Sequence, residues 1–155
     1  MNQLKVGFSS VKITPPAGCR LYGYYVERIA DGVLDDLELR CLALSCNQEK
    51  AVILSADHGG ICDAVLEPIA QAVAAAINVR RSAVFFHETH THTATFVDKD
   101  SENPVEKEYY PVFVNAAVNA AVLAVQDLQP AVLGYVVGTA PNVAFCRRYR
   151  MKDGS

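Results

Sequence analysis

Apolar and polar residues alternate at the start of the chain in a way that predicts a strand. Leu4, Val6 and Phe8 are separated by polar or small residues, which is typical of a half-buried strand. Val11 and Ile13 continue the alternation with the opposite parity, so we expect a bulge or bend between the two halves.

Two further strands are predicted from Leu37 to Cys46 and from Ala51 to Asp57. The polar residues Asn47, Gln48 and Glu49 between them indicate a hairpin turn. The second strand is almost continuously apolar, as expected of a strand covered on both faces.

Helical spacing of apolar residues replaces alternation in two later segments. The first predicted helix runs from Cys62 to about Asn78, and the second runs from Pro111 to Leu128, where the only clear polar stripe is Asn115, Asn119 and Gln126. Such an all-round apolar helix is expected to be buried by more than one layer.

Short apolar runs at Ser82 to His87 and Ala131 to Gly138 predict two more strands, and Asp98 to Lys107 is expected to be a loop. The resulting order β-β-β-α-β-α-β predicts an α/β layered fold with a mostly mixed sheet, two main helices and at least one parallel crossover. We expect residues 1–155 to form a single domain.

Composition narrows the functional classes. The chain has 155 residues, of which 51% are apolar and 20% are charged, and its net charge is −3. This balance gives no electrostatic footprint for nucleic acid, and the apolar content argues against disorder. No apolar run reaches the ~18 uninterrupted residues of a membrane span, so no stable membrane insertion is expected.

The cysteines bear on the cellular compartment. Five cysteines form no CxxC pair, and the first residues lack the apolar core of a signal peptide. We therefore expect a reduced, cytoplasmic protein.

Three of the four histidines lie within six residues, directly after the predicted strand at Ser82 to His87. In an extended backbone His90 and His92 share a face, whereas His87 points the other way. An HxH pair can offer two imidazoles to one metal, or one to a metal and the other to a substrate. Alternatively, the histidines are simply surface loop residues. Zinc needs further ligands, and the residues that could join are His58, Asp57, Glu88 and His87, with no spacing that selects among them.

Two other groups allow both a structural and a functional interpretation. Asp57 and His58 precede Gly59 and Gly60, so they either form a tight turn and helix cap or contribute to a site. Near the end of the chain, the cations between Arg147 and Lys152 form either a solvated tail or a site for phosphate or carboxylate groups.

Several motifs, taken in order, resemble the N-terminal part of the catalytic domain in the neutral/alkaline non-lysosomal ceramidase family. The resemblance extends over essentially the whole chain and is most specific at the opening Ile13-Thr14-Pro15-Pro16-Ala17-Gly18 and at Thr89-His90-Thr91-His92. It also includes Gly23-Tyr24, Ser55-Ala56-Asp57, Gln129 to Gly134 and Arg147-Arg148.

The resemblance implies a zinc-dependent hydrolase that cleaves an N-acyl amide or similar lipid-like substrate. It implies that His90 is a zinc ligand, that His92 contacts the substrate or the transition-state oxygen, and that Arg147 lies near the active site. In the family, the remaining zinc ligands come from beyond the equivalent of Ser155, so we expect the zinc site to be incomplete in this chain.

Two hypotheses stay open from the sequence. One is a ceramidase-like amide hydrolase whose site is completed elsewhere, and the other is a non-catalytic or degenerate α/β module that depends on a partner. In either case, we expect the chain to be one portion of a larger multilayer domain. Because the second helix is apolar around most of its surface, we also expect a homo-oligomer.

Overall fold

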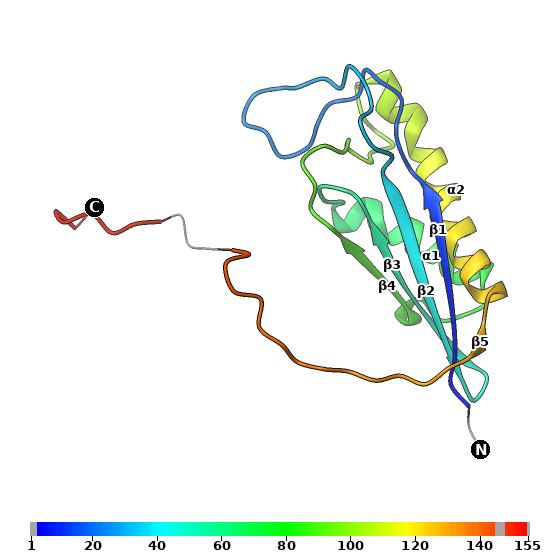
Figure 1. The fold of residues 1–155 in the computed structure, drawn as a ribbon. Coiled ribbons are helices and arrows are strands. Elements are labelled where there is room, and N and C mark those ends of the chain that lie inside the picture. The colour runs from blue at the N-terminus through cyan, green and yellow to red at the C-terminus, as the bar shows by residue number, and fades with distance from the viewer. Residues whose placement is uncertain (1–2, 145–147, 155) are drawn as a thin grey trace.

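The computed structural model describes residues 3–144 and 148–154 and contains one mixed, five-stranded sheet (Figure 1). The order of elements confirms the predicted α/β layered fold. The strands are β1 (Lys5–Lys12), β2 (Glu38–Cys46), β3 (Glu49–Ala56), β4 (Val84–Glu88) and β5 (Gln129–Pro130). The helices are α1 (Asp63–Ala76), a short 3-10 turn η1 (Arg81–Ala83) and α2 (Pro104–Gln126).

The strands lie in the order β4-β3-β2-β1-β5. β1, β2 and β3 are antiparallel neighbours, whereas β3 and β4 are parallel and are joined through α1. The predicted hairpin and the parallel crossover are therefore both confirmed. Asn47 and Gln48 have positive φ angles of 51° and 69°, as a two-residue hairpin turn of the primed type requires.

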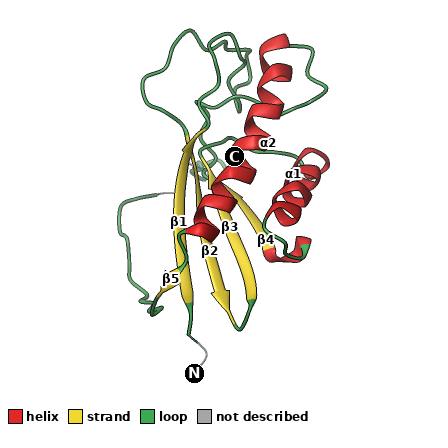
Figure 2. Ribbon diagram, turned by 90° about the vertical axis from the view of Figure 1, so that its right-hand side faces the viewer, coloured by secondary structure: helices red, strands yellow, loops and turns green. Residues whose placement is uncertain are grey.

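Both helices pack on the same face of the sheet, and the core lies between them (Figure 2). The core side chains of β2 and β3 form one alternating row, Leu39, Cys41, Ala43, Val52, Leu54 and Ala56. Phe113 of α2 is the largest of the fully buried side chains. We call the opposite, uncovered face of the sheet the outer face.

The first half of β1 has the reverse parity of the prediction, whereas Val11 and Ile13 pack into the core as expected. β1 pairs with β2 in unbroken register, without the expected bulge, and Phe8 is 66% exposed on the outer face. Gly7 points toward α2, where a Cβ atom would lie only 2.1 Å from the carbonyl oxygen of Ala124. Because the backbone of α2 approaches β1 closely at Gly7, the face of β1 that contains Gly7 packs against the core, and the face with Val6 and Phe8 does not.

The prediction that β3 is covered on both faces is wrong. Its inner row is buried, but Ile53 is exposed on the outer face, so in the described part of the chain β3 is covered on one side only.

α2 begins earlier than predicted. Asn103 caps the helix through its side chain, which accepts a hydrogen bond from the N–H of Val105, and Pro104 occupies the first turn. The polar stretch from Asp98 to Lys107 therefore contains the first turn of α2 as well as a loop. By length and composition alone α2 could cross a membrane, a test that core helices of soluble proteins also pass.

The strand predicted at Ala131 to Gly138 does not form. Only Gln129 and Pro130 pair with β1, and the backbone N–H of Ala131 adds one bond to Leu4. The chain then leaves the sheet as an extended, exposed segment (Figure 1). An apolar run with β-branched residues has strand propensity, but here it meets no neighbouring strand within the described residues.

Candidate functional site

The segment from Thr89 to Thr93, called the histidine motif below, begins directly after β4, at the carboxyl end of the parallel β3–β4 pair. Thr89 is tied to the end of β3 by a hydrogen bond from its N–H to the carbonyl oxygen of Ala56. The carboxyl ends of parallel strands are where α/β folds place their sites. The motif therefore lies at the carboxyl end of the parallel strands, directly after a strand, as the sequence predicted.

His90 and His92 form a close pair. Their Nε2 atoms lie 3.3 Å apart, and their ring centroids are 5.0 Å apart with the rings nearly perpendicular. The backbone between them is not extended, because His90 has a φ of +60°. A positive φ is uncommon for a residue with a side chain and is retained where the surroundings determine it. The two imidazoles thus meet through a turn and not through strand alternation.

Two tyrosines from the long loop after β1 contact the histidine pair. Tyr22 contacts both rings edge-on, at centroid distances of 5.9 Å to His90 and 6.2 Å to His92. Tyr24 approaches His92 at 5.9 Å, and Phe96 lies 5.2 Å from Tyr22. These separations fall in the range where aromatic rings attract one another.

Three glycines make room for this cluster. A Cβ atom on Gly59 would lie 2.1 Å from Cδ1 of Tyr22, and one on Gly60 would lie 2.8 Å from its hydroxyl oxygen. A Cβ atom on Gly23 would lie 2.7 Å from the ring of His92. The glycine pair is therefore more than a turn, because its bare backbone receives the Tyr22 ring.

A buried carboxylate anchors the base of the same loop. Glu106 at the start of α2 is fully buried and accepts hydrogen bonds from the backbone N–H of Arg20, from its guanidinium and from the hydroxyl of Ser101. Burial raises the pKa of Glu106, but the bonds from Arg20 and Ser101 outweigh it and leave the pKa below its ordinary value. The Arg20 guanidinium also lies 5.2 Å from the centre of the Phe96 ring.

Asp57 and His58 have structural roles in this arrangement. Asp57 accepts hydrogen bonds from the N–H of Glu38 and from Arg40, while α1 begins later, with Cys62 at its cap. His58 is buried against Phe113, and its Nδ1 accepts a hydrogen bond from the N–H of Gly60. Burial lowers the pKa of His58 to about 4. His58 is therefore a neutral core histidine.

His87 and Glu88 lie on opposite faces of β4. His87 is exposed on the outer face, where its Nδ1 lies 3.0 Å from the hydroxyl of Ser55. Glu88 is half-buried on the helix side, and its Oε1 has no hydrogen-bond partner among the described residues. Arg147, the remaining predicted site residue, lies outside the described residues.

The donors within the described ranges do not make a complete metal site. Among these residues, no group of three or more histidine, cysteine, aspartate or glutamate side chains is placed to hold one ion. His90 and His92 are therefore a pair without a third protein ligand in residues 3–144 and 148–154.

An apolar groove adjoins the histidine motif. It has a volume of about 640 Å³ and lies between the segment that follows β1 and the segment that precedes β2. Leu21, Ile29, Val33 and Leu34 supply apolar side chains, Asp31, Asp35 and Asp36 also line the groove, and Thr93 of the histidine motif borders it.

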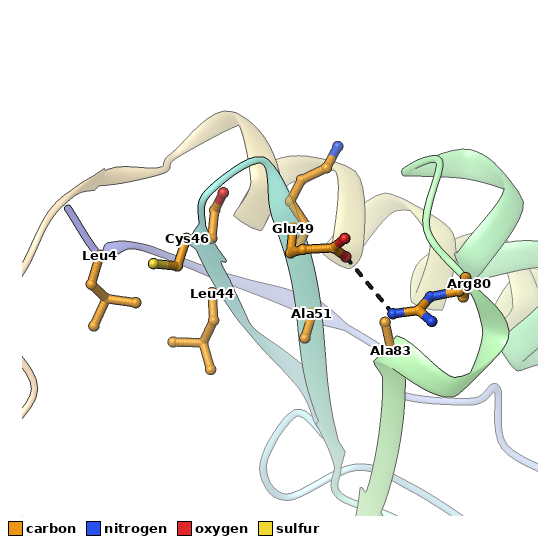
Figure 3. Close-up of a pocket in the computed structure, with 9 residues that line it drawn as sticks. Leu4, Leu44, Cys46, Glu49, Ala51, Arg80 and Ala83 are labelled. Atoms are coloured by element: carbon orange, nitrogen blue, oxygen red, sulfur yellow. Dashed lines mark ion pairs between the residues drawn. The ribbon is translucent and has the colours of Figure 1, made fainter. Parts of the chain in front are cut away.

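A second hollow lies at the other end of the sheet, beside the β2–β3 turn (Figure 3). Its ion pair between Arg80 and Glu49 spans 3.9 Å, and both side chains are more than four-fifths exposed. Such a pair contributes little, and none of the predicted site residues that the structure describes lines this hollow.

The structure thus has an α/β layered fold with a histidine pair at the carboxyl end of its parallel strands. Among solved structures, the chain is similar to the neutral ceramidase from Pseudomonas aeruginosa, with a TM-score of 0.69 and 22% identity. A structure titled as a ceramidase complexed with C2 gives the same TM-score at 20% identity. Each match covers 84% of this chain but only 22% of the other.

These comparisons confirm the ceramidase resemblance at the level of the fold, for a part of the ceramidase chain. No protein-family model matches the sequence, and no curated protein matches it.

Sequence reasoning missed Tyr22, the glycine contacts and the apolar groove. The loop from Cys19 to Asp36 has no hydrophobic period, so nothing in the pattern indicated which of its side chains face the histidines. The available signal was compositional, namely three tyrosines beside Gly23 and the apolar residues Ile29, Val33 and Leu34 in a segment too irregular for the core.

Proposed function

We propose that the chain is part of a ceramidase-like, zinc-dependent hydrolase of N-acyl amides, and that it supplies the first metal ligand, His90. The observation that carries the proposal is the 3.3 Å separation of the His90 and His92 Nε2 atoms. Two nitrogens bound at about 2.0–2.1 Å to a tetrahedral zinc ion lie roughly 3.3–3.4 Å apart. The donor set and its spacing therefore fit zinc.

The chemistry follows from what each side chain can do. Zinc, when bound, polarises a carbonyl group and makes water a stronger nucleophile near neutral pH. His90 must be neutral to bind the metal. Where its Nε2 is not bound to the metal, His92 can instead donate a hydrogen bond to the substrate carbonyl or to the transition-state oxygen. Tyr22 and Tyr24 contact the imidazoles edge-on.

The remaining ligands are proposed to come from outside the described residues. A catalytic zinc ion usually takes three protein ligands and a water molecule, so two imidazoles alone would bind it weakly. The chain spans 22% of the length of the ceramidases that it resembles. Arg147 keeps its predicted place near the site as part of this proposal.

The substrate class follows from the apolar groove. An N-acyl chain needs an apolar surface close to the reacting bond, and the groove that contains Leu21, Ile29 and Leu34 reaches Thr93 of the histidine motif. A lipid-like amide is therefore the substrate that this geometry favours.

Zinc binding tests the proposal. We expect calorimetry to detect one zinc ion for each histidine pair, and we expect His90→Ala to abolish that binding. His87→Ala is the matched control, because His87 bonds to Ser55 on the outer face and should leave zinc binding unchanged. Absence of binding to the unmodified chain in every oligomeric state would contradict the proposal.

The second candidate is a non-catalytic α/β module, which is favoured by the lack of a third ligand among the described residues. This function predicts no zinc in the purified protein and an unchanged melting temperature when His90 and His92 are both replaced by alanine. Metal-dependent hydrolysis of an N-acyl substrate would exclude it.

A homo-oligomer belongs to the same proposal and concerns the outer face. Phe8 and Phe85 are 66% and 61% exposed there, and an exposed apolar face of this kind is typical of an interaction surface. We expect light scattering on a sizing column to give more than one chain per particle, and Phe8→Lys with Phe85→Lys to reduce that number. Ser10→Lys, on the same face but beside polar residues, serves as a charge control. A strictly monomeric unmodified chain would contradict this expectation.

A further inference from the structure

Tyr22 is not a core residue, yet it has the most extensive contacts with the histidine pair of any described side chain. Its ring is half-buried and meets His90 and His92 with interplanar angles of 77° and 72°. Edge-to-face contacts fix the orientation of a ring as well as its distance. One side chain therefore restrains both imidazoles at once.

The Tyr22 ring also packs against Gly59 and Gly60. No larger residue fits at Gly59 or Gly60 without moving the ring, because a Cβ atom added to Gly59 would lie 2.1 Å from Cδ1 of Tyr22. The N–H of Tyr22 also donates a hydrogen bond to the carbonyl oxygen of Ala94, at 2.9 Å. This bond ties the tyrosine to the segment that carries His92.

Arg20, two residues before Tyr22, is also held in place by its contacts. Arg20 bonds through its backbone and its guanidinium to the fully buried carboxylate of Glu106, and the guanidinium covers Phe96. Phe96 in turn contacts the Tyr22 ring at 5.2 Å. The contacts thus run without a gap from a buried ion pair to the two imidazoles.

We propose that Tyr22, held against Gly59 and Gly60, is the positioning residue that keeps His90 and His92 at a spacing suited to binding one divalent cation. This inference rests on the proposed metal-binding function and adds to it the residue that organises the ligands. Ligand orientation matters because replacing a residue that orients metal ligands typically costs about 10–100-fold in metal affinity.

The test compares variants that remove the ring, keep the ring or move the ring. Tyr22→Ala removes it and Gly59→Ala displaces it, so both should weaken zinc binding about 10–100-fold. Tyr22→Phe keeps the ring, and since the Tyr22 hydroxyl has no hydrogen bond among the described residues, it should bind zinc like the unmodified chain. Gly32→Ala is the matched glycine control, because a Cβ atom there would meet nothing within 4 Å.

A second readout separates this inference from the proposed function. In NMR spectra, the ring protons of His90 and His92 should shift in Tyr22→Ala and Gly59→Ala but not in Tyr22→Phe, with or without metal. If the unmodified chain binds no zinc while these shifts occur, the proposed function fails and the positioning role stands. Unchanged ring-proton shifts in Tyr22→Ala, or zinc affinity equal to that of the unmodified chain, would overturn the positioning role. Tyr22→Leu, which retains apolar bulk, replaces Tyr22→Ala if that variant does not fold.

Discussion

Lowering the pH from 7 to 4 is expected to remove about 3 kcal/mol of stability through His58 alone. His58 is 1% exposed, and burial lowers its pKa from 6.5 to about 4. Between these two values the unfolded chain binds a proton that the folded chain does not, so the stability falls as the pH falls. Below about pH 4 both states are protonated, and this loss stops growing.

Urea unfolding at several pH values measures this effect. His58→Leu should lower stability at pH 7, because the N–H of Gly60 loses its acceptor, but should flatten the slope between pH 6.5 and 4. His87→Gln is the control, because it removes a histidine on the outer face and leaves the buried His58 in place. A slope that persists in His58→Leu would show that another group causes the loss.

Much of the fold follows from local patterning. The hairpin is predictable because Asn47 and Gln48 interrupt two apolar runs and tolerate positive φ angles. The crossover through α1 is predictable because apolar residues at helical spacing lie between two short strands. These features depend on neighbours along the chain, so the sequence contains the information needed to predict them.

Two of the errors, the buried row of β1 and the strand expected at Ala131 to Gly138, arose where distant segments decide the outcome. Alternation cannot show which row of β1 is buried, and only the approach of α2 to Gly7 settles it. The segment from Ala131 to Gly138 has strand propensity, but a strand needs a partner, and none lies beside it within the described residues. Both errors concern long-range contacts.

The candidate site was predictable in part for the same reason. The HxH spacing and its place after a strand indicated the histidine pair, although the positive φ of His90, and not an extended backbone, brings the rings together. His58 could not be assigned from sequence, because its packing against Phe113 depends on α2. The role of Tyr22 depends on Gly59 and Gly60, which are far from it in sequence.

Arg20→Ala is expected to destabilise the folded chain by about 3 kcal/mol at pH 7, because it leaves the carboxylate of Glu106 buried without its cation. The Glu106 side chain is 0% exposed, while the Arg20 side chain is 36% exposed, so nearly all of the penalty falls on the carboxylate. Its pKa, now below the ordinary value, should rise above it when Arg20 is absent. Stability of Arg20→Ala should therefore increase as the pH falls from 7 toward 5, once the His58 contribution has been subtracted.

A double-mutant cycle isolates the ion pair from the rest of the loop. Glu106→Gln in the Arg20→Ala background removes the buried, unpaired negative charge, so the double variant should be more stable at pH 7 than Arg20→Ala alone. Arg40→Ala is the matched control, because Arg40 pairs with Asp57 and Glu38 at an exposed position and should cost less than about 1 kcal/mol. If the double variant is no more stable than Arg20→Ala, the loss comes from the contact between Arg20 and Phe96 and not from the buried charge. Aromatic packing would then hold the long loop after β1 in place, and the stability that this packing contributes would not depend on pH.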